Sequence, residues 1–273
     1  MPLPFDPPLQ ENELYDAFPN LTSIKIIKSG GEGTVFKAYN NLLDLDVAIK
    51  VYSSDHMQKR TELEIKKLSQ IDNPHLIKCI SYGDVLVRGK NCYYTETPFI
   101  IGKDLNHIYE TKQTLNYSET TTLILDISSA ISSLWKQRVV HCDIKPDNIL
   151  NNNSSYVLID LGVAKHLDSA TLTAYGVIMG TRGYFAPEQL KGRKNLTLRA
   201  DFYSLGIVAY QMLVGYHPYN FNQNAMFTQP LPPFPPNIAT THALKNTIIQ
   251  MTSLNPIDRP MNYEEICRLL KGE

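Results

Sequence analysis

The hydrophobic pattern of the chain changes once, close to residue 100, and this change constrains the fold more than any other feature. Before it, β-branched and aromatic runs separated by Gly, Asn and Asp are typical of strands and cover residues 23–30, 33–40, 45–52 and 91–100. After it, apolar residues at three- and four-residue spacing predict helices over residues 118–135 (N-cap Ser118), 198–214, 242–254 and 263–270. One more helix is predicted among the strands, over residues 59–71. The sequence therefore predicts an α+β chain with a small β-rich lobe, residues 21–100, and a larger, mainly helical lobe, residues 101–273.

The composition is that of a folded globular protein, with 43% hydrophobic and 19% charged residues. The formal net charge of −1 gives no overall basic field, so nucleic acid is not an expected partner. The four cysteines, Cys79, Cys92, Cys142 and Cys267, stand far apart and never as a C-x-x-C pair. This spacing argues against a zinc site or a disulfide framework and suits a reducing, cytoplasmic location.

Neither a secretory signal nor a membrane span is expected. A secretory signal begins with basic residues before an apolar run, whereas no Lys or Arg precedes Lys25. The longest apolar stretch, residues 203–216, is interrupted by Gly206 and Gly215. Because it falls short of the ~18 apolar residues of a span, we predict a buried helix there.

Two segments are rich in proline. Residues 1–20 are predicted to form an extended, proline-rich N-terminal arm, because proline is incompatible with regular helix. The segment PLPPFPP at residues 230–236 could be a polyproline ligand, but a rigid loop between helices is the favoured interpretation.

A glycine-rich segment, KSGGEGTV at residues 28–35, lies between two predicted strands. Gly30 and Gly33 would let the backbone approach phosphate oxygens that any Cβ would hold away. Taken alone, such a hairpin is more often simply a turn.

The next predicted strand ends in Val47-Ala48-Ile49-Lys50. Strand alternation places Val47 and Ile49 on one face, and Ala48 and Lys50 on the other. A lysine on that face could reach nucleotide phosphates if a carboxylate held it, and Glu64 in the small lobe's predicted helix is the best candidate. Taken singly, these residues would be a surface lysine and a solvated glutamate.

The most specific motif is HCDIKPDN at residues 141–148, followed by DLG at residues 160–162. Together with the earlier motifs, it resembles the eukaryotic-type (Hanks-type) protein kinase family, serine/threonine class, over residues 23–270. The family's catalytic loop H-R-D-L-K-P-x-N appears here as HCDIKPDN, and its D-F-G appears as DLG. The resemblance implies a bilobal protein kinase fold, with an antiparallel β-rich N-lobe that holds one key helix and a mainly helical C-lobe. It also implies ATP and Mg²⁺ as cofactors and proteins as substrates, and the Asn- and Ile-rich usage favours a bacterial member.

The resemblance implies a role for each polar residue of these motifs. Asp143 would accept or orient the substrate hydroxyl proton, and Lys145 would neutralise charge on the γ-phosphate. Asn148 and Asp160 would supply oxygen ligands for Mg²⁺. His141 is expected to be a structural ring packed against the DLG segment rather than a proton carrier. The implied catalytic set is Lys50, Glu64, Asp143 and Lys145.

Three later segments also resemble family motifs. Residues 180–188, GTRGYFAPE, resemble the G-T-x-x-Y-x-A-P-E segment, and residues 201–206, DFYSLG, resemble D-x-W-S-L-G. Residues 255–260, NPIDRP, resemble the late D-x-R-P motif. The resemblance implies that Arg259 pairs with Glu188 to stabilise the fold.

The resemblance also implies the residues that contact ATP. The apolar contacts to adenine would come from Ile27, Val35, Ala48 and Leu150. An alignment on residues 102–105 places Thr97 at the gatekeeper position, Pro98, Phe99 and Ile100 in the hinge, and Asp104 at the ribose. Because proline has no N–H, the adenine hydrogen bonds would use backbone groups of Ile100 and the Phe99 carbonyl. The complete predicted ATP-binding set is Ile27, Gly30, Gly33, Val35, Ala48, Lys50, Thr97, Phe99, Ile100, Asp104 and Leu150.

Three functions are compatible with these motifs. Lys145 and Thr181 favour a serine/threonine kinase, since tyrosine kinases of this family differ near both positions. A catalytically weak pseudokinase scaffold is the first alternative, because Lys28 and Cys142 stand where the family has glycine and arginine. The second is a small-molecule phosphotransferase, a class that lacks the Lys145–Pro146 pair and the A-P-E segment. The sequence favours the first function and leaves the protein substrate and the oligomeric state open.

Overall fold

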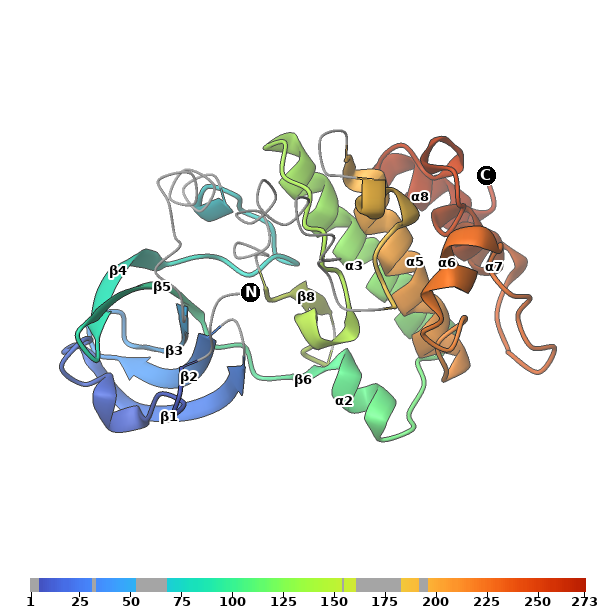
Figure 1. Cartoon of the computed structure of the whole chain (residues 1–273). Coiled ribbons are helices and arrows are strands. Elements are labelled where there is room, and N and C mark those ends of the chain that lie inside the picture. Colours follow the sequence, from blue (N-terminus) through green and yellow to red (C-terminus); the bar gives the residue numbers. More distant parts are fainter. Residues whose placement is uncertain (1–4, 31–32, 53–67, 154, 161–182, 192–195) are drawn as a thin grey trace. The chain divides into compact units, whose positions relative to one another are not determined.

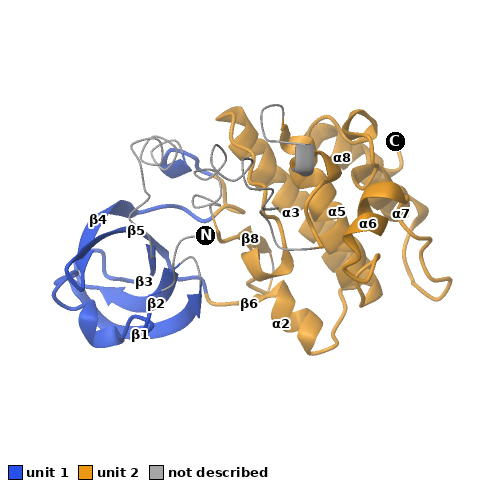
Figure 2. Cartoon of the chain, viewed as in Figure 1, with its two compact units in different colours: residues 1–72, 77–100 blue, residues 73–76, 101–273 orange. Residues whose placement is uncertain are grey.

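The computed structural model describes residues 5–30, 33–52, 68–153, 155–160, 183–191 and 196–273 (Figure 1). The chain divides into two compact units (Figure 2). Unit 1 comprises Met1–Asp72 and Ile77–Ile100, and unit 2 comprises Asn73–Leu76 and Ile101–Glu273. Apart from the short segment Asn73–Leu76, the two units meet in sequence at Ile100 and Ile101, and the sequence predicts a boundary near residue 100.

Unit 1 is built on an antiparallel sheet of five strands in the order β1-β2-β3-β5-β4 (Figure 1). The strands are β1 (Leu21–Gly30), β2 (Gly33–Asn40), β3 (Leu45–Tyr52), β4 (Ser81–Val87) and β5 (Lys90–Pro98). All except β4 were predicted. Gly83 and Asp84 give β4 the composition of a loop, but its alternating Val85 and Val87 are buried, and its backbone pairs with β5.

The N-terminal residues from Phe5 onward contribute to the core of unit 1. The sequence predicted an extended arm here and did not predict this packing. Leu9 and Leu14 are both 0% exposed and belong to the same core as Phe36 and Ile49. A short 3-10 helix, η1 (Glu11–Glu13), lies between these leucines. It is compatible with the sequence because the prolines of this segment lie outside it.

Arg88, in the turn between β4 and β5, holds this N-terminal segment. Its Nε and Nη2 donate to the two carboxylate oxygens of Glu13, at 2.5 and 2.8 Å. Its Nη1 donates to the Pro7 carbonyl at 2.5 Å, and Nη2 also donates to the Pro8 carbonyl at 3.0 Å. The planar guanidinium thus fixes both a side chain and the backbone around the buried leucines.

Unit 2 holds the helices α2 (Leu105–Glu110), α3 (Tyr117–Lys136), α5 (Leu198–Val214), α6 (Gln223–Thr228), α7 (His242–Met251) and α8 (Tyr263–Lys271). The predicted helix over residues 198–214 is confirmed with the same bounds, while α7 ends three residues earlier than predicted. The N-cap of α3 is Asn116 and not Ser118, so that detail of the prediction is wrong. Asn116 Oδ1 accepts from Glu119 N, and Glu119 Oε2 accepts from Asn116 N, which forms a capping box.

The helix α5 is the centre of unit 2. Almost every residue from Leu198 to Leu213 is buried, which confirms the prediction of a buried helix. It packs against α3 and α7 (Figure 1). It starts at the N-cap Thr197 and ends at Gly215, whose φ of 89° is the left-handed conformation that favours glycine. Within the described ranges, no helix combines the length and the apolar character needed to cross a bilayer.

A small antiparallel sheet stands beside the helices, in the order β6-β7-β8. Its strands are β6 (Lys103–Asp104), β7 (Ile149–Asn151) and β8 (Tyr156–Leu158). The strand β7 directly follows a 3-10 helix, η2 (Pro146–Asn148). These short elements carry the predicted catalytic loop and its flanks.

The burial of Leu14 gives a test of the N-terminal packing. Leu14→Ala should lower the free energy of unfolding by ~2–5 kcal/mol, because it leaves a cavity in the core of unit 1. Tyr15→Ala, at the neighbouring position that is 46% exposed, is the matched control and should change it by less than ~0.5 kcal/mol. Urea unfolding of both variants measures the difference. Equal stabilities would show that the segment does not contribute to the core.

Candidate active site

The backbone of the predicted catalytic loop is held by Asp201, in the first turn of α5. Its Oδ2 accepts from His141 N and its Oδ1 accepts from Cys142 N, both at 2.8 Å. Cys142 has a φ of 62°, a left-handed conformation that is unfavourable for a residue with a Cβ. The two hydrogen bonds therefore stabilise a turn that the chain would not adopt by local preference.

The Asp201 carboxylate is 1% exposed. Burial raises its pKa to about 6, although the backbone N–H groups of His141 and Cys142 favour the charged form. The sequence identified Asp201 through its motif but did not predict this contact with the catalytic loop.

Three of the polar side chains in residues 143–148, those of Asp143, Lys145 and Asn148, form one connected group. Lys145 Nζ lies 3.3 Å from Asp143 Oδ2. Asn148 Nδ2 donates to Asp143 Oδ2 and to the Asp143 backbone carbonyl, both at 3.0 Å. Asp143 and Asn148 are 6% and 7% exposed, so these contacts lie in a site of restricted water access. The geometry fixes the orientation of the Asp143 carboxylate.

His141 is fully buried, and both ring nitrogens contact the backbone. Its Nδ1 accepts from Asp143 N at 3.3 Å, so its Nε2 carries the proton that is donated to the Asp160 carbonyl. This is the structural contact with the DLG segment that the sequence predicts for His141.

The two predicted Mg²⁺ ligands, Asn148 and Asp160, lie in segments that a backbone hydrogen bond connects. Ile159 N donates to the Asn148 carbonyl at 2.9 Å, which joins η2 to the residue before Asp160. Since Asn148 Nδ2 points to Asp143, its Oδ1 is the amide atom suited to a hard cation. Among the described residues, no group of three or more His, Cys, Asp or Glu side chains is arranged to hold a metal ion. Two hard oxygen donors from Asn148 and Asp160 are compatible with an Mg²⁺ that keeps waters and phosphate oxygens as most of its ligands.

The predicted pair between Arg259 and Glu188 is confirmed. Arg259 Nη1 and Nη2 donate to the two Glu188 carboxylate oxygens at 2.6 and 2.9 Å. The guanidinium also donates to the carbonyls of Ser253 and Arg199, at 2.7 and 2.9 Å, and lies 4.8 Å from the Tyr203 ring centroid. A buried cation satisfied on every side in this way makes the A-P-E segment part of the helical core.

Gln189, the residue after the A-P-E segment, was not identified from the sequence. Its Nε2 donates to the Cys142 carbonyl at 3.1 Å, and its Oε1 accepts from Ala186 N at 2.7 Å. It therefore connects the catalytic loop to the A-P-E segment. A lone glutamine beside a motif gives no pattern from which this contact could have been predicted.

In unit 1, β3 has the predicted alternation. Val47 and Ile49 are buried, whereas Ala48 and Lys50 are half-buried on the other face. Lys50 pairs in register with Val35 on β2 and with Thr95 on β5, and its Nζ lies 4.9 Å from the Tyr52 ring centroid. Glu64, the predicted partner of Lys50, lies outside the described residues, as does most of the helix predicted over residues 59–71.

The residues of unit 1 predicted to contact adenine lie on neighbouring strands. Ala48 is the register partner of Thr97, so the predicted gatekeeper lies directly across from it. Val35 on β2 is half-buried and is the register partner of Lys50 on β3. Ile27 is 50% exposed and falls at the irregularity in the pairing of β1 with β2.

The two glycines of the phosphate-binding segment differ in what they require. A Cβ on Gly33, whose φ is 147°, would lie 2.1 Å from the Val51 carbonyl oxygen. Gly33 is therefore needed for the pairing of β2 with β3, whatever else it binds. A Cβ on Gly30 would meet no atom within 4 Å, so the sheet does not require glycine there.

The predicted hinge has one backbone donor already in use. Phe99 N donates to the Asp46 carbonyl at 2.9 Å. Lys37 lies over the Phe99 ring, 4.4 Å from its centroid, and pairs with Asp46 at 2.7 Å. This contact uses the Phe99 N–H, and not the Phe99 carbonyl or the Ile100 backbone groups that the sequence predicts for adenine.

In unit 2, Asp104 and Leu150 are direct register partners in the β6–β7 pair. Both are half-buried. Asp104 Oδ1 accepts from His107 N at 2.7 Å as the N-cap of α2. Asp104, predicted to contact the ribose, and Leu150, predicted to contact adenine, thus lie side by side. One carboxylate oxygen of Asp104 is used in the helix cap.

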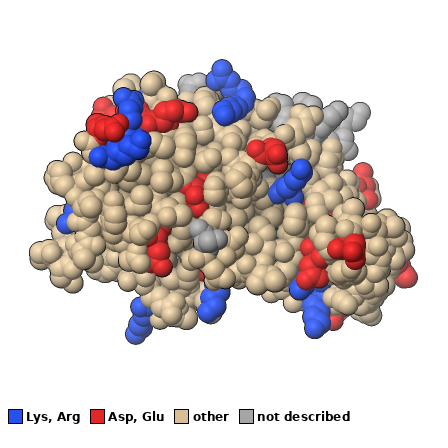
Figure 3. Space-filling model, turned by 180° about the vertical axis from the view of Figure 1, so that it is seen from behind, with Lys and Arg blue, Asp and Glu red and all other residues tan. Residues whose placement is uncertain are grey.

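The surface drawn in Figure 3 carries small, separated groups of Lys and Arg and of Asp and Glu, with no extended area of one sign. The distribution on this face agrees with the formal net charge of −1.

Comparison with known proteins gives the family of this chain. The family model of the protein kinase domain matches residues 21–268. The chain therefore belongs to the protein kinase family, as its motifs predict.

Bacterial kinases are among the similar proteins. The chain is 30% identical over 261 residues to the serine/threonine-protein kinase pkn3 of Myxococcus xanthus, covering 88% of this chain and 47% of the relative. It is 30% identical over 203 residues to the serine/threonine-protein kinase PrkC of Bacillus subtilis, covering 72% of this chain and 31% of the relative. The chain thus spans about half, or less, of the length of these relatives.

A solved structure confirms the predicted bilobal α+β kinase fold. The kinase domain of PknI from Mycobacterium tuberculosis superposes with a TM-score of 0.71 at 19% sequence identity. The match covers 93% of this chain and 96% of that domain.

The raised pKa of Asp201 predicts an unusual pH dependence. A folded-state pKa of about 6 lies above the ordinary value of about 3.9, so the folded protein takes up this proton first on acidification. As the pH falls from about 7 to about 5, the free energy of unfolding of the wild type should therefore rise relative to that of Asp201→Asn, because residue 201 cannot take up a proton in the variant. Urea unfolding at several pH values measures this gap.

Asp84→Asn, at an exposed position, is the control for general charge effects. The difference in unfolding free energy between this variant and the wild type should not change in the same way as the pH falls. A gap between wild type and Asp201→Asn that is constant over this range would show that burial does not raise the pKa of Asp201.

Proposed function

We propose that this chain is a serine/threonine protein kinase that transfers the γ-phosphate of ATP to protein hydroxyl groups. The observation that carries the proposal is the connected group of Asp143, Lys145 and Asn148, with Lys145 Nζ 3.3 Å from Asp143 Oδ2. The names of the bacterial relatives support the same activity and the same acceptor residues.

Each residue of this group has a task that its position suits. Asp143 receives or orients the proton of the acceptor hydroxyl, and its orientation is fixed by Asn148 and Lys145. Lys145 carries its charge at the end of a long aliphatic stem, and it can neutralise charge that gathers on the transferred phosphoryl group. The chain thus supplies positioning and charge neutralisation, which are the main requirements of phosphoryl transfer.

ATP and Mg²⁺ are the proposed cofactors. Asn148 and Asp160 would hold the metal, which when bound neutralises phosphate charge. The proposed ATP contacts are those predicted from the sequence, and Lys50 would be the cation on the phosphates. We further propose a reducing, cytoplasmic location, which is supported by the four cysteines, all of them free thiols.

Asp143→Asn tests the catalytic loop. The variant should lose turnover by on the order of 10²–10⁴-fold, because an amide cannot accept the hydroxyl proton. It should keep its stabilisation by Mg-ATP, since the residue faces the acceptor. Phosphate incorporation into a generic basic protein, followed by mass spectrometry, and thermal melting give the two readouts. Transfer at the wild-type rate would show that Asp143 is not the base.

Asp160→Ala tests the metal site and separates an enzyme from a scaffold. The variant should lose both turnover and the part of its ATP-induced thermal stabilisation that EDTA removes from the wild type. Asp147→Ala, in the catalytic loop and outside the predicted metal set, is the control. A wild-type protein that binds ATP equally well in EDTA and shows no turnover would support a pseudokinase scaffold instead.

A further inference from the structure

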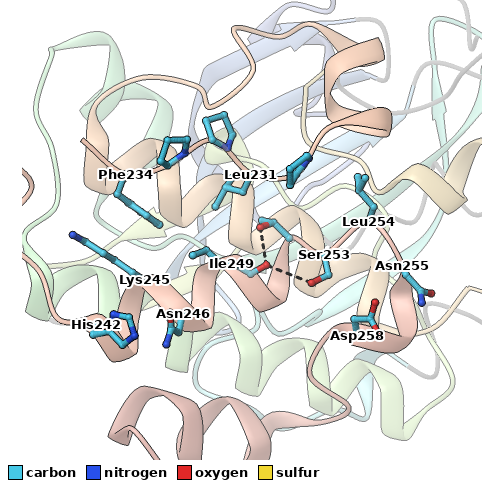
Figure 4. A pocket seen from close by; sticks show the side chains of 14 residues that line it. Leu231, Phe234, His242, Lys245, Asn246, Ile249, Ser253, Leu254, Asn255 and Asp258 are labelled. Carbon is cyan, nitrogen blue, oxygen red and sulfur yellow. Dashed lines mark hydrogen bonds between the residues drawn. The ribbon is translucent and has the colours of Figure 1, made fainter. Parts of the chain in front are cut away.

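Unit 2 has a cavity of about 600 Å³ that none of the residues proposed for catalysis or ATP lines. Its walls are the proline-rich segment from Pro230 to Phe234 on one side and α7 with the turn that follows it on the other (Figure 4). We call this cavity the α7 groove. Its volume is in the range of sites that hold ligands or peptide side chains.

The proline-rich wall of the α7 groove is rigid and apolar. Five of the seven residues 230–236 are proline, and proline fixes the backbone and has no N–H to donate. The wall is held by α5, because Tyr210 lies 4.8 Å from the Phe234 ring, centroid to centroid, and its hydroxyl donates to the Pro233 carbonyl at 3.4 Å. The wall is therefore a preformed surface, which reduces the entropy cost of binding.

The opposite wall exposes an isoleucine to solvent. Ile249, on α7, is 47% exposed, and it faces a groove that Leu231, Phe234 and Leu254 also line (Figure 4). One exposed isoleucine is ordinary on a protein surface. An exposed isoleucine that lines a hollow with prolines and an aromatic ring is instead typical of an interaction site.

The two ends of the α7 groove carry opposite charges. Lys245 lies at one end and Asp258 lies at the other (Figure 4). Lys245 Nζ is 5.9 Å from the Phe234 ring centroid, and none of the described carboxylates forms an ion pair with it. Across the described part of the chain, no cation pairs with Asp258 either. Each end of the groove can therefore attract a group of opposite charge on a partner.

We propose that the α7 groove binds an extended segment of a partner protein, with an acidic residue at Lys245, apolar residues in the middle and a basic residue at Asp258. The exposed side chain of Asn246, on α7, offers amide donors and an acceptor for the backbone of such a segment.

This occupant suits the groove better than the alternatives do. A second copy of the chain in a symmetric pair would bring hollow against hollow and leave both unfilled. Strand addition is excluded at the proline-rich wall, because the prolines provide no row of N–H donors. The binding requires no catalysis, so the proposal extends beyond the kinase activity and does not depend on it.

Short, capped, fluorescent peptides with an acidic residue at one end, leucine and proline in the middle and arginine at the other end are suitable probes. The same sequence in reverse covers both directions, and fluorescence anisotropy with the full chain measures binding. One direction should bind saturably. Lys245→Glu should weaken that binding about tenfold, and a peptide with lysine in place of its acidic residue should restore it.

Ile249→Asp should reduce peptide binding below detection, because it places a charge on the apolar wall. Ile257→Asp is the matched control, since Ile257 is 74% exposed and does not line the groove, and Lys271→Glu is the control for Lys245→Glu. Both controls should bind like the wild type.

Three outcomes would overturn the proposal. The first is no saturable binding of either peptide direction. The second is binding that Lys245→Glu and Ile249→Asp leave unchanged. The third is self-association in sedimentation experiments that Ile249→Asp abolishes, which would show that the occupant is a second copy. Phosphate transfer to a generic protein should be equal in all variants, and because this readout is separate, failure of the kinase proposal would not affect the peptide result.

Discussion

The buried carboxylate of Asp201 is the contact on which the described active site depends. It binds two successive backbone N–H groups of a loop that contains a left-handed residue, Cys142. Without both acceptors, the loop would lose the constraint that presents Asp143 to Lys145 and Asn148. The same burial raises the pKa of Asp201, so the charge is retained at a cost in stability. Keeping a charged Asp201 in this position thus lowers the free energy of unfolding while it fixes the catalytic loop.

The helix α5 supports more than this one loop. Arg259 donates to the carbonyl of Arg199 and lies over the ring of Tyr203, both on α5, while it binds Glu188 of the A-P-E segment. On the same helix, Tyr210 holds the proline-rich wall of the α7 groove. The catalytic loop, the A-P-E segment and the groove are therefore fixed to one buried element, and each can be precise without large contacts of its own.

Apolar residues at the two-residue period of strands and the three- to four-residue spacing of helices predicted most of the fold, because an element buried on one face has apolar residues at that spacing. They missed contacts that depend on the third dimension. Leu9 and Leu14 stand among prolines and acidic residues, and only the opposing core of unit 1 explains their burial. The motif at residues 141–148 pointed to Asp143, Lys145 and Asn148, because the chemistry of phosphoryl transfer constrains both residue type and spacing. It could not predict Gln189, whose contact with Cys142 joins residues distant in sequence.

Cys142 stands where many members of this family have an arginine. The side chain is 3% exposed and carries no positive charge that a phosphate on a neighbouring loop could neutralise. The backbone at this position is instead joined to the A-P-E segment by the neutral amide of Gln189, which donates to the Cys142 carbonyl and accepts from Ala186 N. A neutral hydrogen-bonded link needs no counter-charge to form. The backbone of the catalytic loop is therefore held by Asp201 and by Gln189, through contacts that involve no phosphate on a neighbouring loop.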